Sequence, residues 1–113
     1  MSLQAQGLRA WLWQRLTSVY IALFVLVALL ACLLHGPWSY SEWRMLFAHP
    51  AINIATALLV LALLFHAWVG LRDILVDYVP PLGLRFGILV IMMVILLSLG
   101  IWAMWTLIRI VAL

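Results

Sequence analysis

Charged side chains are scarce in this sequence, and lysine is absent altogether. Only 8% of the 113 residues are charged, and the net charge of +3 comes from arginine alone. A soluble domain of this length needs far more polar surface, so an ordinary soluble fold is excluded. The basic balance is better explained as a signal for orientation in a membrane than as a nucleic-acid-binding surface.

Cysteine is nearly absent as well, since Cys32 is the only one in the chain. A single cysteine excludes an internal disulfide and a metal site built from several thiolates of this chain. Metal or cofactor binding would therefore rest on other side chains, histidine above all.

Apolar residues, in contrast, are abundant: 70% of the chain is hydrophobic and its mean hydropathy is +1.29. Three long apolar stretches each approach the roughly 20 residues that a bilayer-spanning helix requires. We predict an all-α membrane protein with three transmembrane helices, at about 16–35, 51–78 and 86–108, in a single anchor domain over residues 1–113. So small a chain has little interior of its own, and a buried cofactor would be shared with other subunits.

The first connector contains strong signals for local structure. The first span is expected to end at His35–Pro37, where glycine and proline stop the helix. Ser39 and Glu42 then form a capping-box pattern, with Ser39 as N-cap and Glu42 three residues later. We expect a short helix over Tyr40–Ala48 that lies in the membrane interface.

The second span is expected to start at Pro50, which suits the first turn of a helix. It should continue as a helix to Tyr78, because Pro80 and Pro81 then prevent its extension. His49 has no partner at ligand spacing and is expected to be a solvated loop histidine.

The arginines predict how the chain is oriented. Three spans put the termini on opposite sides, so one side has four arginines and the other has two: Arg9, Arg15, Arg72 and Arg85, against Arg44 and Arg109. The positive-inside rule then places the N-terminus in the cytoplasm.

His66 is the most unusual residue of the second span, and His66, Gly70, Asp73 and Asp77 fall on one helical stripe. A charge at the centre of a span costs about 2.5–3.5 kcal/mol, but a histidine can stay neutral, which is also the form that coordinates metal. Two interpretations stay open: a haem axial ligand, or a hydrogen bond to a neighbouring helix. Ala62 and Gly70, one turn on either side, would leave space for a flat macrocycle.

Asp77 lies about 16 Å further along the helix from His66, and Tyr78 follows it. A carboxylate at a helix C-terminus opposes the helix dipole, which indicates another use for it. A phenol can donate to a carbonyl oxygen and a carboxylate can relay a proton, as reduction of a quinone head group requires. Arg15 is either an interfacial anchor or a cation beside a carboxylate-bearing ligand.

These motifs together resemble a known family. The runs Gln14–Thr17, His66–Gly70 and Val76–Pro80, within a three-span frame, resemble the smaller cytochrome b anchor subunits of succinate dehydrogenase, respiratory complex II. The likeness covers essentially the whole chain. It implies a haem-binding helix bundle shared with a second anchor subunit.

The resemblance also implies roles for single residues. His66 would be one axial ligand of haem b, with the second histidine supplied by the partner anchor subunit, and Arg15 would pair with a haem propionate. Tyr78 would hydrogen-bond a carbonyl of ubiquinone, and Asp77 would support that site and its proton uptake. Arg72 and Asp73 depart from the family pattern; we expect a local ion pair or a contact with the iron–sulfur subunit, and no catalytic role.

The implied partners are the second cytochrome b anchor subunit, the iron–sulfur subunit, the flavoprotein subunit and membrane lipid, without nucleic acid. The complex would sit in the bacterial cytoplasmic (inner) membrane and pass electrons from succinate, in the tricarboxylic acid cycle, to ubiquinone. The chain alone would have no catalytic activity. Two alternatives are a haem-free structural subunit of another membrane complex and a small homo-oligomeric channel or transporter. The lack of charge within the long apolar stretches, the second of which runs to Leu71, disfavours the channel or transporter.

Overall fold

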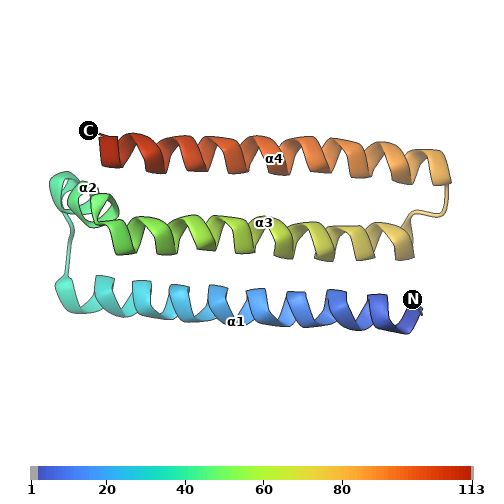
Figure 1. The fold of residues 1–113 in the computed structure, drawn as a ribbon, viewed down its shortest axis with the longest axis horizontal. Coiled ribbons are helices and arrows are strands. Elements are labelled where there is room, and N and C mark those ends of the chain that lie inside the picture. Colours follow the sequence, from blue (N-terminus) through green and yellow to red (C-terminus); the bar gives the residue numbers. More distant parts are fainter. Residues whose placement is uncertain (1–2, 113) are drawn as a thin grey trace.

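The structure is a computed structural model that describes residues 3–112, with side chains from Gly7 onwards. Its four helices are α1 (Leu3–His35), α2 (Tyr40–Ala48), α3 (Pro50–Tyr78) and α4 (Leu82–Ala112), as Figure 1 shows. Residues 1, 2 and 113, which the predicted domain includes, lie outside the described residues. Within the described part, α1, α3 and α4 are long and apolar enough to cross a membrane, so the prediction of an all-α chain with three candidate spans is confirmed.

Helix α3 is the central element of the molecule. Helices α1 and α4 run antiparallel to it on either side, and in the described part of the chain they do not contact each other (Figure 1). The molecule measures 50 × 25 × 24 Å. Since the hydrocarbon core of a bilayer is about 30 Å thick, the ends of the long helices reach beyond it. Helix α1 starts well before the predicted span at residue 16, because no proline interrupts residues 3–15.

The chain has almost no core. Among the described residues only Val69 and Leu107 are buried large apolar side chains, exposed by 5% and 7%. Most other large apolar side chains of the three long helices face outward. Apolar surface on this scale has to be covered by lipid or by other subunits.

The contact between α3 and α4 includes a close approach at one glycine and a hydrogen bond from one amide. Gly100 is buried against Leu64, and a Cβ at position 100 would lie 2.6 Å from Leu64 Cδ1. The Asn53 side chain donates from Nδ2 to the carbonyl oxygens of Phe47 and Leu107, at 2.9 and 3.1 Å. Small residues and inter-helix hydrogen bonds are the usual means of helix association in lipid, where burial of apolar surface contributes little.

The contact between α1 and α3 is also made through side-chain donors and backbone acceptors. The Tyr20 hydroxyl donates to the carbonyl oxygen of Ala55 at 2.6 Å. Further along the same contact, Gln14 Nε2 donates to the carbonyl oxygen of His66 at 3.3 Å. These two bonds link α1 to α3 at two levels along their contact.

The predicted capping box and short helix are confirmed. Glu42 N donates to Ser39 Oγ at 3.3 Å, and Ser39 N donates to the Glu42 carboxylate at 2.7 Å, at the start of α2. The backbone hydrogen bond from Ser39 lowers the pKa of Glu42 from its usual 4.5. His35 ends α1 as expected; its ring stacks on Trp38, with centroids 3.8 Å apart.

His49 has a structural role that the sequence prediction missed. It is exposed, as expected of a loop histidine, but it is the N-cap of α3, and its Nδ1 accepts a hydrogen bond from Ala51 N at 3.2 Å. Pro50 occupies the first turn as predicted, so the residue before it necessarily takes the cap position.

Candidate functional site

The candidate residues on α3 lie at two depths. His66 is half-buried, about 18 Å along the helix from Tyr78 at the end of α3. Asp77 and Tyr78 form the last turn before the extended residue Val79, beyond which two prolines follow. One helix therefore has an imidazole near the middle of its length and a carboxylate and a phenol at its end.

The His66 ring is bonded to α1. Its Nδ1 atom lies 3.3 Å from Thr17 Oγ1 and 3.4 Å from Ser18 Oγ. The inter-helix hydrogen bond that was one of the two interpretations of His66 is therefore present. It uses Nδ1 only: among the described side chains none hydrogen-bonds Nε2, so the second ring nitrogen can still serve as a ligand.

Gln14 lies beside Gly70, where space for a flat macrocycle was expected. A Cβ at this position would meet Gln14 Nε2 at 3.6 Å, so the Gln14 side chain of α1 occupies that side of the glycine. The stripe that contains His66 and Gly70 packs against α1 on this side. A flat macrocycle beside His66 would have to lie on another side of the ring.

The donor set at His66 is small. Among the described residues no group of three or more His, Cys, Asp or Glu side chains could hold a metal ion. A zinc-type site needs three or four protein ligands, whereas haem takes a single axial nitrogen from each side.

Arg15 lies on α1, on the stripe that also holds Trp11 and Ser18. Its guanidinium Cζ is 5.9 Å from the centroid of the Trp11 ring, a cation–π distance. The side chain is exposed and pairs with no described carboxylate. It can therefore act as an interfacial anchor or receive an external carboxylate.

Asp77 and Tyr78 are both exposed, Tyr78 by 79%. Neither side chain hydrogen-bonds another described residue, although Arg85 Nη1 donates to the nearby carbonyl oxygen of Val76 at 3.5 Å. The structure brings the carboxylate and the phenol to the same helix end without enclosing them.

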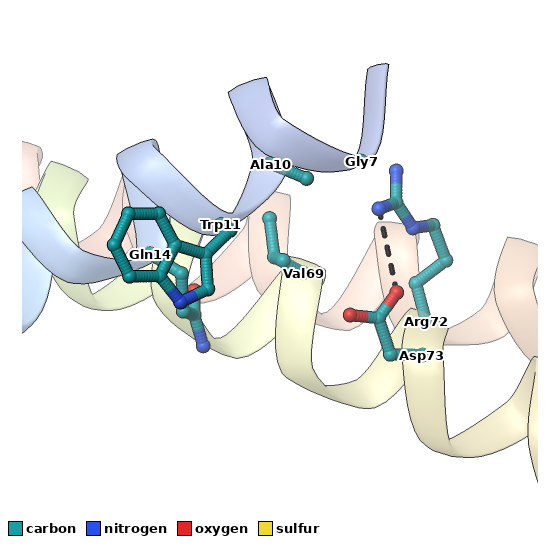
Figure 2. A pocket seen from close by; sticks show the side chains of 7 residues that line it. All are labelled: Gly7, Ala10, Trp11, Gln14, Val69, Arg72 and Asp73. Carbon is teal, nitrogen blue, oxygen red and sulfur yellow. Dashed lines mark hydrogen bonds and ion pairs between the residues drawn. The ribbon is translucent and has the colours of Figure 1, made fainter. Parts of the chain in front are cut away.

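A cavity of about 520 Å³ lies between the N-terminal half of α1 and the C-terminal half of α3 (Figure 2). It is lined by Gly7, Ala10, Trp11, Gln14, Val69, Arg72 and Asp73. Arg72 Nη2 lies 3.4 Å from Asp73 Oδ1, so the predicted local ion pair is present. Gln14 Oε1 is buried there without a described hydrogen-bond partner. Sequence reasoning missed this cavity; the charged pair Arg72–Asp73 in a mostly apolar helix was its only signal.

Comparison with known proteins supports the resemblance to the membrane anchor subunits of succinate dehydrogenase. Residues 2–101 match the family described as succinate dehydrogenase/fumarate reductase transmembrane subunit. The chain is 31% identical over 98 residues to the succinate dehydrogenase hydrophobic membrane anchor subunit of Coxiella burnetii (strain RSA 493 / Nine Mile phase I), an alignment that covers 87% of this chain and 85% of that one. A homo-oligomeric channel finds no support in these relatives. The chain therefore belongs to the succinate dehydrogenase/fumarate reductase transmembrane subunit family, as a hydrophobic, multi-pass membrane anchor subunit.

Proposed function

We propose that this anchor subunit supplies one axial ligand of haem b through His66, and part of a ubiquinone-reduction site through Asp77 and Tyr78. The observation that carries the proposal is the layout of α3, which has a half-buried imidazole near its middle and an exposed carboxylate and phenol at its end. Reduction of ubiquinone takes up two electrons and two protons. A chain that holds a redox centre within the membrane and proton-handling groups at its surface suits that reaction.

The residues present fit haem. The imidazole of His66 is the single nitrogen donor that one side of a haem needs, and its Nε2 has no hydrogen-bond partner among the described side chains. Bound haem would supply one-electron transfer. Arg15, exposed on α1 and three residues before Ser18, would pair with a haem propionate.

The quinone would meet the end of α3. The Tyr78 hydroxyl would donate a hydrogen bond to a carbonyl oxygen of ubiquinone, and the neighbouring Asp77 carboxylate would pass protons from water towards that oxygen. Both side chains are exposed, so other subunits would have to enclose the head group. This requirement agrees with a site shared between chains.

The exposed apolar surface of α1, α3 and α4 supports obligatory assembly with a second cytochrome b anchor subunit and lipid. We place the N-terminus and the α3–α4 turn on the cytoplasmic side of a bacterial inner membrane, because that end has four of the six arginines. The iron–sulfur and flavoprotein subunits would dock there and deliver electrons from succinate. The isolated chain would be inactive.

The haem assignment is tested by His66→Ala in the assembled complex. We expect the reduced-minus-oxidised spectrum to lose its b-type haem signal, because one axial nitrogen is gone. His49→Ala is the matched control: this exposed histidine caps α3, and its loss should leave the haem signal unchanged. Flavin content measures assembly in each preparation. A full haem signal in the assembled His66→Ala complex would exclude His66 as a ligand.

A further inference from the structure

Two hydroxyl groups of α1 face the His66 ring, and their protons are already used elsewhere. We propose that Thr17 and Ser18 are positioning residues that hold His66 with the proton on Nδ1 and the lone pair on Nε2. The consequence for haem binding rests on the proposed function above. The tautomer itself follows from hydrogen-bond distances within this chain.

Each hydroxyl has a single proton to donate, and backbone carbonyl oxygens, which can only accept, take both protons. Thr17 Oγ1 lies 2.9 Å from the carbonyl oxygen of Trp13 and 3.0 Å from that of Gln14. Ser18 Oγ lies 2.7 Å from the same Gln14 oxygen. All three distances are shorter than the 3.3 and 3.4 Å from these hydroxyls to Nδ1 of His66.

With their protons donated along α1, the two hydroxyl oxygens present lone pairs to the imidazole. Nδ1 must then be the donor, in a three-centre hydrogen bond shared between Thr17 and Ser18. Long distances of 3.3 and 3.4 Å are expected when one N–H is shared between two acceptors. A neutral imidazole has one N–H, so Nε2 keeps its lone pair.

The backbone beside the ring is fixed as well. Gln14, one turn before Ser18, donates from Nε2 to the carbonyl oxygen of His66. Its amide passes beside Gly70, and a Cβ at that position would lie 3.6 Å from Gln14 Nε2. Three polar residues of α1 thus hold both the backbone and the ring of His66, and the ring directs Nε2 away from the hydroxyls.

In metal sites, a ligating histidine commonly donates its other ring N–H to a neighbouring acceptor, as His66 does here to Thr17 and Ser18. A histidine that donates its second N–H to an acceptor is a more basic ligand and has a fixed ring orientation, and loss of such a partner typically costs about 10–100-fold in affinity. We therefore expect Thr17 and Ser18 to strengthen haem binding and to lower the midpoint potential of the haem, since a more basic ligand favours oxidised iron.

The test is the double substitution Thr17→Val and Ser18→Ala in the assembled complex. We expect haem to be retained about 10–100-fold more weakly and its midpoint potential to rise. The single substitution Thr17→Ser keeps a hydroxyl at this position, so haem retention and midpoint potential should stay at the wild-type values. The control is Thr56→Val with Ser98→Ala, because these hydroxyls also bond the carbonyl one turn earlier in their own helix but do not contact His66. Flavin content again reports assembly.

The outcomes separate this inference from the proposed function. No b-type haem in the wild-type complex would overturn the proposed function, and ¹⁵N spectra of the histidine-labelled complex would then still report the tautomer of His66. A proton on Nε2 in those spectra would overturn the inference. So would an assembled double variant whose haem affinity and potential equal those of the wild type and of the control.

Discussion

At the scale of single residues, the two ends of the proposed electron path are built differently. His66 is held by hydrogen bonds with three α1 residues. The side chains of Asp77 and Tyr78 instead hydrogen-bond no other described residue and are exposed. A metal ligand benefits from a fixed ring, whereas a substrate site at the membrane surface has to admit a quinone between turnovers.

Tyr78→Phe tests the quinone site at this scale. Removal of the phenol hydroxyl deletes the proposed donor to the quinone oxygen, so quinone reduction should slow by roughly 100-fold. Succinate oxidation with an artificial dye as electron acceptor should stay at the wild-type rate, because the flavoprotein is untouched. Tyr40→Phe is the control, since Tyr40 is 80% exposed at the start of α2. Equal quinone reductase rates for Tyr78→Phe and wild type would exclude the proposed role of Tyr78.

At the scale of the elements, α2 is the clearest case of a helix set by local chemistry. It has only 9 residues and no buried residue, and so short a helix is marginal without caps. The reciprocal bonds between Ser39 and Glu42 satisfy backbone donors at its first turn. His35 Nε2 lies 3.6 Å from the Glu42 carboxylate, which links the end of α1 to the same cap.

Ser39→Ala should destabilise α2 by about 1 kcal/mol, because the N-cap acceptor is lost. Faster amide hydrogen exchange over Tyr40–Ala48 is the expected result, with α3 unaffected. Met45→Ala is a suitable control, since Met45 is exposed in α2 and is not part of the N-cap. Unchanged exchange in α2 after loss of Ser39 would show that its contacts with α3 and α4 hold it without the cap.

The cap also predicts how α2 responds to acid. The hydrogen bond from the Ser39 backbone lowers the pKa of Glu42 in the folded state, so the carboxylate contributes stability that is fully present above the unfolded value of 4.5. That contribution is lost as pH falls through the lower folded pKa. Hydrogen exchange in α2 should therefore accelerate below pH 4.5 beyond the intrinsic pH effect. Glu42→Gln, which can still bond Ser39 N, should remove this dependence.

At the scale of the whole molecule, three long helices associate through few close contacts. Helix α3 lies between α1 and α4 (Figure 1), and hardly any large side chain is enclosed. The α3–α4 approach is closest at Gly100, beside Leu64. Substitution of this glycine by a larger residue should therefore lower the stability of the assembled membrane domain more than substitution of a glycine with open space around it.

Gly100→Leu should lower the thermal stability of the complex, because the new side chain would overlap Leu64 and push α4 away from α3. Overpacking of this kind costs about 1–3 kcal/mol. Gly87→Leu is the matched control on the same helix, since no atom lies within 4 Å of a Cβ built there. Equal melting temperatures for the two variants would show that α4 does not depend on the contact at Gly100.

Much of this architecture could be read from the chain in one dimension. Apolar stretches near the length of a bilayer span and the proline stops after Tyr78 predict the three long helices. The Ser39–Glu42 pattern predicts α2, and the arrangement of His66, Asp77 and Tyr78 along one helix predicts the candidate residues. Such features depend on the hydrophobicity of a stretch, on the helical period and on hydrogen bonds between residues close together in the sequence.

Other features required the helices to be packed. That α3 is central, that Gln14 occupies the space beside Gly70, and that Thr17 and Ser18 bond Nδ1 of His66 all depend on how α1 lies along α3. The cavity between Trp11 and Arg72 arises in the same way. Partners more than 45 residues apart in the chain come together only through the relative rotation and register of two helices. Neither quantity follows from local propensity, because both are set by side-chain contacts between the helices.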